Sequence, residues 1–125
     1  MPALRLILPF ATPSQNQTER WHWAQKARLR DEVQLMTRVA MRKAGLPPGY
    51  RETRRMVLRV VRHGPKPLDF GNLVGGFKWC LDALVREGAL RDDSTQWVSE
   101  HYSQATPHPD HPDGVTFVTL DPEAV

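Results

Sequence analysis

Residues 55–63 read RMVLRVVRH, and this stretch decides the fold because β-branched and other apolar residues fill a run of strand length. Met56, Leu58 and Val60 alternate with their neighbours, so a strand would carry all three on one face. The turn sequence GPKP at residues 64–67 ends the run. The stretch therefore predicts a strand with one apolar face, against which other elements pack.

A shorter strand and a long helix are expected before residue 55. Residues 4–10, LRLILPF, have the length of a strand, and Pro9 indicates an edge position or a strand end. Between Trp23 and Ala44, apolar residues recur every three or four positions and predict a long amphipathic helix. They are Leu29, Val33, Met36, Ala40 and Ala44. Gly45 and the PPG sequence at 47–49 end this helix.

A second helix and two further strands are expected after residue 67. A second stripe at helical spacing consists of Leu73, Phe77, Leu81, Leu84 and Val85. Gly88 is expected just past the end of this helix. Residues 96–102 and 115–120 predict strands, separated by a loop at 106–114. The order β-α-β-α-β-β predicts an α+β fold in which two helices pack on a small mixed sheet.

Length and composition favour a soluble, intracellular protein. The 125 residues allow one compact domain, 1–125, and 40% hydrophobic with 25% charged residues is ordinary for a globular chain. The net charge of +3 permits a polyanionic partner. Cys80 is the single cysteine, which is typical of a reducing compartment, and it is expected to be an inert core residue. Residues 4–10 are too short to span a membrane, so we expect a cytoplasmic protein.

The densest group of chemically informative residues is the string LDFGNLVGGFKWCLDALVREGALRDDS at residues 68–94. Its polar side chains of interest are Asp69, Asn72, Lys78, Asp82, Asp92 and Asp93. Carboxylates on separate elements can hold Mg²⁺ together with phosphate oxygens of a substrate. A lysine beside them can stabilise negative charge that develops on a phosphate.

This string resembles the RusA family of Holliday-junction resolvases. Family members carry a D-x-D-N-L segment, then a helix with K-x-x-x-D-A-L, then a glycine and a D-D pair before the next strand. The chain matches the second half without a gap over residues 78–93. In the first half, Gly71 stands where the family has its second Asp, and Gly75 and Gly76 are among extra residues. The strings PSQN and WHWA upstream also look like elements of phage-type members, so the resemblance covers most of residues 4–120.

The resemblance implies a Mg²⁺-dependent endonuclease, encoded by a bacterium or a phage, that cuts four-way DNA junctions in recombination and repair. It also implies a homodimer. Asp69, Lys78 and Asp93 would be catalytic, and Asp69, Asp93 and Asp92 would hold the metal. Asn72 and Asp82 would support them, Asp82 by orienting Lys78 from one helical turn away. The residues expected to hold the DNA backbone are Arg20, Lys26, Arg28, Arg30, Arg62 and Lys66.

Plainer interpretations remain open for the same residues. The loss of an acid at Gly71 leaves room for a protein that binds branched DNA without cutting it. Asp69 with Asn72 is typical of a helix cap, and the pair at 92–93 is typical of a turn.

Two further features upstream and downstream have alternatives as well. Trp21 and Trp23 could stack on unpaired bases, although we expect them to divide between core and surface. The prolines in the 106–114 loop favour an irregular exposed segment. That segment contains His108, Asp110, His111 and Asp113, which could otherwise bind a metal.

Overall fold

Strand β2, Met56–His63, lies inside a four-stranded sheet, as its composition predicts. The strand order β1-β4-β2-β3 places β4 (Val115–Pro122) on one side of β2 and β3 (Val98–Ala105) on the other. Met56, Leu58 and Val60 are all buried. This computed structural model describes residues 3–124. It contains both helices and strands, which confirms the α+β class predicted from the sequence.

The sheet is mixed. β1 (Leu4–Leu8) and β2 both pair with β4 in antiparallel fashion, whereas β2 and β3 run parallel along their full lengths. Parallel neighbours need a crossover connection. Two short helices supply it, α3 (Phe70–Gly76) and α4 (Lys78–Arg86).

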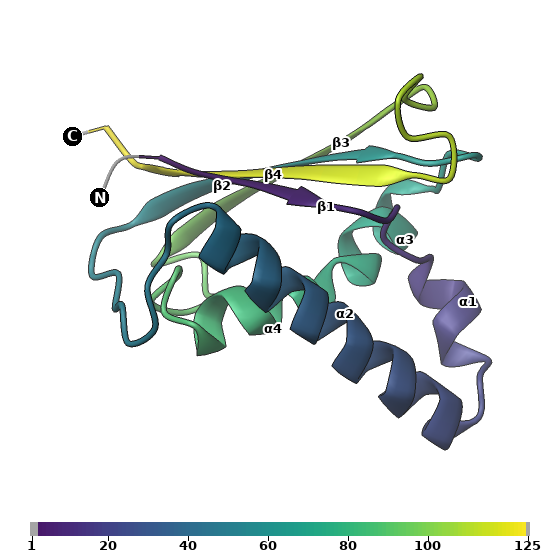
Figure 1. Cartoon of the computed structure of the whole chain (residues 1–125), viewed down its shortest axis with the longest axis horizontal. Helices are drawn as coiled ribbons and strands as arrows, with labels where there is room; N and C mark the ends of the chain where they lie inside the picture. Colours follow the sequence, from purple (N-terminus) through teal and green to yellow (C-terminus); the bar gives the residue numbers. More distant parts are fainter. Residues whose placement is uncertain (1–2, 125) are drawn as a thin grey trace.

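The helices gather on one side of the sheet, where α2 (Trp23–Lys43) runs beside α4 (Figure 1). Val33, Ala40 and Met41 of α2 are buried, and Gly45 ends the helix with a φ of +100° that a side chain rarely adopts. The core unites residues of β1, α2, β2, α4 and β4, so the described residues share one hydrophobic interior.

The single helix predicted over residues 73–85 is in fact two helices that meet at Phe77. Phe77 is both the C-cap of α3 and the N-cap of α4, and its ring is almost fully buried. The prediction was wrong because apolar spacing counts residues and does not record a change in backbone direction. Gly75 and Gly76, which are weak helix formers, directly precede the break.

The chain also forms a helix that the sequence did not predict, α1 (Gln15–Glu19). The proline-rich segment before it was interpreted as a turn only. The side chain of Ser14 caps this short helix by accepting a hydrogen bond from the backbone N–H of Gln17 (3.4 Å). Among the strands, β1 ends at Leu8 and β3 covers 98–105 instead of 96–102, because its pairing with β2 sets its length.

Candidate active site

Lys78 brings two of the predicted carboxylates together at the start of α4. Its Nζ lies 2.8 Å from Oδ2 of Asp93 and 3.0 Å from Oδ1 of Asp82, one helical turn along α4. The hydrogen bond from Lys78 holds the pKa of Asp93 below its usual range, and the two carboxylates raise the pKa of Lys78. All three side chains are about half exposed. The ammonium of Lys78 therefore lies between the side chains of Asp82 and Asp93, within reach of solvent.

Asp69 lies in a second polar group at the other end of α3. Its Oδ1 accepts a hydrogen bond from the backbone N–H of Asn72 (2.9 Å), and its Oδ2 accepts one from Nδ2 of Asn72 (2.9 Å). The side-chain oxygen of Asn72 in turn accepts the backbone N–H of Asn16 in α1 (2.8 Å). Asp69 is thus the N-cap of α3, as its cap interpretation predicts, and Asn72 ties α3 to α1.

Glycines explain how α1 reaches this position. A Cβ on Gly76 would lie 1.9 Å from the carbonyl oxygen of Pro13, and one on Gly75 would lie 1.9 Å from Oε1 of Gln15. A side chain at Gly76 would push the segment before α1 away from α3, and one at Gly75 would displace the side chain of Gln15 in α1. The extra glycines in the RusA-like string therefore have a packing role in this chain.

The two polar groups lie at opposite ends of α3, and no hydrogen bond or ion pair joins them among the described residues. Asp69 precedes α3 and Lys78 follows it, and its 7 residues span about 10 Å at 1.5 Å per residue. Within residues 3–124, no three His, Cys, Asp or Glu side chains are placed to hold a metal ion together. Carboxylate oxygens are the donors that Mg²⁺ prefers, and one or two of them suffice when phosphate oxygens complete the shell. Asp69 and Asp93 thus fit Mg²⁺ in donor type, as two carboxylates that substrate oxygens would complement.

Asp92 and Asp93 lie in a turn that other segments brace. Oδ1 of Asp92 accepts the backbone N–H of Asp93 (2.8 Å), which agrees with the turn interpretation. The carbonyl of Gly88, at the start of this segment, accepts the backbone N–H of Glu52 (2.8 Å). The guanidinium of Arg55 donates to the carbonyl of Thr95 beyond the turn (3.1 Å). The loop before β2 therefore positions the segment that presents Asp93.

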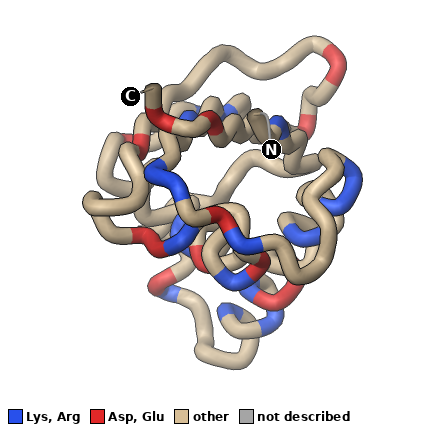
Figure 2. The backbone as a smooth tube through the Cα atoms, turned by 90° about the vertical axis from the view of Figure 1, so that its left-hand side faces the viewer, with Lys and Arg blue, Asp and Glu red and all other residues tan. Residues whose placement is uncertain are grey.

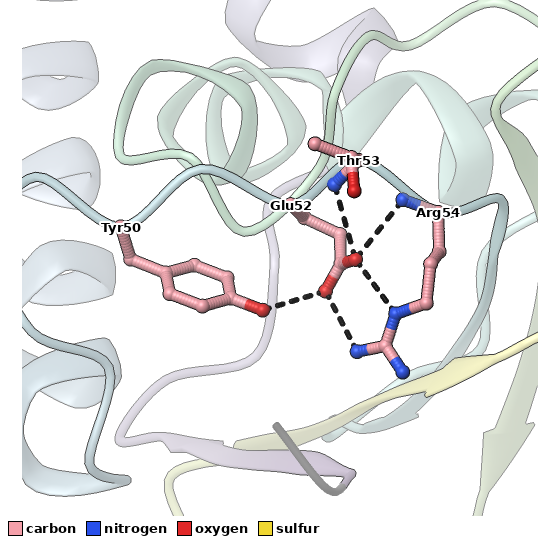
Figure 3. A network of polar contacts seen from close by, with 4 residues as sticks. All are labelled: Tyr50, Glu52, Thr53 and Arg54. Atoms are coloured by element: carbon pink, nitrogen blue, oxygen red, sulfur yellow. Dashed lines mark hydrogen bonds and ion pairs between the residues drawn. The ribbon is translucent and has the colours of Figure 1, made fainter.

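Glu52, which the sequence analysis missed, organises that loop (Figure 3). Its buried carboxylate accepts hydrogen bonds from the hydroxyl of Tyr50 (2.8 Å), the backbone N–H of Thr53 (3.1 Å), and the backbone (3.0 Å) and guanidinium (2.9 and 3.1 Å) of Arg54. The bonds from the Arg54 side chain lower the pKa of Glu52 to about 2. A short Y-x-E-x-R pattern was the available signal, but its meaning depends on a loop conformation that local sequence does not specify.

Glu52 is expected to make stability depend on pH in the acid range. A folded-state pKa of about 2 lies below the ordinary value of 4.5 for a glutamate, so the charged form stabilises the fold above pH 4.5. This contribution, up to about 3 kcal/mol by the pKa difference, is lost as the pH falls from 4.5 to 2. Urea unfolding should show that Glu52→Gln is less stable than wild type at pH 7. The difference in their free energies of unfolding should shrink as the pH falls toward 2. A gap that stays constant with pH would contradict this role.

The predicted DNA-contacting residues divide into surface residues and one buried residue. Arg20, Arg28, Arg30 and Lys66 are exposed and Lys26 is half-buried. Figure 1 shows that α1, the start of α2 and the end of β2 lie at the same end of the molecule. In Figure 2, Lys and Arg positions are interspersed with Asp and Glu along the chain, so the charge pattern does not itself define a binding face.

Arg62 does not lie on the surface as predicted. It is buried, and its guanidinium donates to the backbone carbonyls of Thr12 (2.8 Å) and Lys66 (3.0 Å). The alternation that buries Met56, Leu58 and Val60 places Arg62 on the same face of β2, so the surface prediction overlooked the period of the strand. A surface arginine was expected, and a buried cation is found.

The remaining candidates are the two upstream tryptophans, Cys80 and the 106–114 loop. Trp23 is exposed and Trp21 is half-buried. Burial raises the pKa of the Cys80 thiol to about 12, which makes it the inert core residue that the sequence predicts. In the 106–114 loop, an isolated antiparallel β-bridge pairs the backbones of His108 and His111. The rings of His63 and His108 pack edge to face.

Comparison with models of known protein families found no match, and comparison with curated proteins found none either. The resemblance to RusA-type resolvases therefore rests on the residues of the 68–94 string. None of the helices within residues 3–124 has the length and apolar character to cross a membrane.

Proposed function

We propose that this protein is a Mg²⁺-dependent endonuclease that cuts four-way DNA junctions. The observation that supports this best is the group formed by Lys78, Asp82 and Asp93, which places a cation and two carboxylates together at an exposed helix start. A phosphodiester can reach such a group from solvent. We further propose a cytoplasmic protein, encoded by a bacterium or a phage, that acts in recombination and repair.

In this proposal each residue of the group has a separate task. Lys78 stabilises the charge that develops on the scissile phosphate, and Asp82 orients the ammonium from one turn away. Asp69 and Asp93 hold Mg²⁺ with oxygens of the bound DNA, and Asp92 maintains the turn that presents Asp93. Mg²⁺ held by these residues would supply an activated water and would shield phosphate charge. Phosphate oxygens of the DNA would complete the coordination of the metal, because one or two carboxylates suffice when substrate oxygens are also ligands.

A second candidate is a protein that binds branched DNA without cutting it. Two observations favour it: Gly71 occupies the position of a family acid, and the described residues contain no three-ligand metal group. In this case Lys78 and the exposed arginines would contact phosphates, and the carboxylates would keep the lysine oriented.

We also propose that the active form is a homodimer. β1 is an edge strand, so one side of its backbone has no neighbouring strand within the sheet. Beside it, a groove of about 480 Å³ is lined mainly by apolar residues of β1 and α2, among them the exposed Ile7, Leu35 and Val39. An apolar groove next to an open strand edge is a surface that a second copy can cover.

Cleavage of a labelled synthetic four-way junction tests the enzymatic proposal. Wild type is expected to cut the junction with Mg²⁺ and to stop in EDTA, while linear duplex stays intact. Asp93→Asn should reduce cutting at least 100-fold, because it removes a metal ligand and the anionic partner of Lys78. Asp113→Asn, the same change on an exposed loop residue, is the matched control and should cut normally. A junction that is bound but left intact by wild type would favour the second candidate.

A further inference from the structure

Arg62 carries a buried positive charge that has no acidic partner. Only 7% of the residue is exposed, and among residues 3–124 no carboxylate forms an ion pair with it. Burial lowers the pKa of its guanidinium from the ordinary value. Removing a cation from water without a counter-charge is costly, so buried arginines are ordinarily paired. The fold thus maintains a cation that an anion would stabilise.

The guanidinium is held in place but only partly used. Nε donates to the carbonyl of Thr12 (2.8 Å) and Nη1 donates to the carbonyl of Lys66 (3.0 Å). A guanidinium has five N–H donors, and Nη2 has no hydrogen-bond partner within residues 3–124. The two bonded carbonyls come from segments before α1 and after β2, so they orient the group while leaving donors for a ligand.

These donors belong to a preformed pocket. Arg62 lines a pocket of about 260 Å³ between residues 64–67 and residues 104–107, and its lining contains no Asp or Glu. The exposed Lys66 adds a second cation to this lining. The side-chain amide of Gln104 both accepts from and donates to the backbone of Leu68 (2.7 Å each), which ties the two walls together.

Gly64 provides the space that the guanidinium occupies. A Cβ at this position would lie 2.4 Å from Nη1 of Arg62 and 2.6 Å from its Cζ, both far closer than a normal contact. Any side chain at residue 64 would therefore displace the guanidinium. The backbone of Gly64 does not have a positive φ, so the absence of a side chain serves the packing against Arg62.

We propose that this pocket binds a phosphate group, with Arg62 and Lys66 as its cations. The guanidinium fork matches the oxygens of a phosphate, and the pocket wall contributes no acid to repel it. A DNA backbone phosphate is the source we favour, which rests on the proposed function: the loop at 64–67 leads directly into Asp69 at the start of α3. A free phosphate compound would offer the same chemistry.

The first test uses inorganic phosphate and requires no DNA. Thermal unfolding is measured with phosphate or chloride at equal ionic strength for wild type, Arg62→Gln, Gly64→Ala and Arg86→Gln. Arg86 is an exposed arginine at the end of α4, so its variant matches the loss of one charge away from the pocket. Phosphate should raise the Tm of wild type and of Arg86→Gln relative to chloride. It should not change the Tm of Arg62→Gln or of Gly64→Ala. Gly64→Ala retains Arg62 but displaces its guanidinium. It therefore distinguishes the effect of moving the guanidinium from the effect of removing the arginine.

The second test measures junction binding in EDTA by the same four proteins. Arg62→Gln and Gly64→Ala should lose about tenfold in affinity, with a salt dependence shallower by about one phosphate contact, while Arg86→Gln changes little. A phosphate effect on Tm with unchanged DNA affinity would support the pocket and assign it to a free phosphate compound. No phosphate effect on wild type, together with equal DNA losses in Arg62→Gln and Arg86→Gln, would overturn the proposal. If wild type fails to bind junctions, the proposed function fails while the phosphate result still decides the pocket.

Discussion

Gly71→Asp is expected to raise Mg²⁺-dependent cleavage of a four-way junction by about tenfold or more, since added carboxylate ligands change metal affinity on that scale. A Cβ on Gly71 would have the side chain of Asp69 as its nearest neighbour, at 3.7 Å, which is an ordinary contact. The new carboxylate would therefore fit beside Asp69. It would also lie in the first turn of α3, where a negative charge stabilises a helix.

Single-turnover cleavage across a Mg²⁺ titration measures this effect. Gly71→Asn is the matched control, because it has nearly the same size and helix position but lacks the charge. The aspartate variant should gain activity at lower Mg²⁺ than wild type, and the asparagine variant should not. An equal gain in both variants would assign the effect to the helix, and no gain in a folded aspartate variant would contradict the metal role of Asp69.

Gly88→Ala is expected to destabilise the fold by about 3 kcal/mol or more, at the upper end of single substitutions. Gly88 has a φ of +83°, and a Cβ there would lie 1.8 Å from the carbonyl oxygen of Tyr50 and 2.7 Å from Nη1 of Arg51. The backbone of the Glu52 loop would have to move. Because the carbonyl of Gly88 also accepts the N–H of Glu52, the segment presenting Asp93 would lose its brace.

Gly49→Ala is a control in the same loop region. Gly49 has a φ of +81°, so an alanine there would have almost the same backbone strain as an alanine at Gly88. A Cβ at Gly49, however, would have nothing within 4 Å. Its substitution should cost only about 1 kcal/mol, the strain of a left-handed residue. Urea unfolding of the two variants at pH 7 isolates the contact with Tyr50. Equal losses would mean that the close approach of the loop to Gly88 does not contribute to stability.

Local pattern was a good guide wherever one element could be recognised by its own spacing. The alternation of Met56, Leu58 and Val60 predicted the buried face of β2, and the stripe through Val33 predicted the buried face of α2. It was a poor guide at Phe77, where the apolar period continues across a break between helices. Periodicity reports which side chains are buried, and the buried positions continue from Leu73 in α3 to Cys80 and Leu84 in α4 although the backbone breaks between them.

The candidate site was predictable only in part for the same reason. Lys78 and Asp82 are neighbours by helical spacing, so their ion pair followed from the sequence alone. Asp93 joins them through a turn that Glu52 braces from a distant loop. The separation of Asp69 from this group depends on the length and direction of α3, which the string of residues does not record.

The sequence by itself therefore determined the α+β class, the faces of β2 and α2, the inert Cys80 and the cap at Asp69, because each depends on neighbours within a few positions. Tertiary structure alone decided the strand order, the hydrogen-bond partners of Arg62 and the network around Glu52. Arg62 bonds to Thr12, 50 residues away, and its pocket forms only where the loop after β2 meets the end of β3. Burial and charge pairing are set by such distant contacts, so the residues that carry them become visible only in the folded chain.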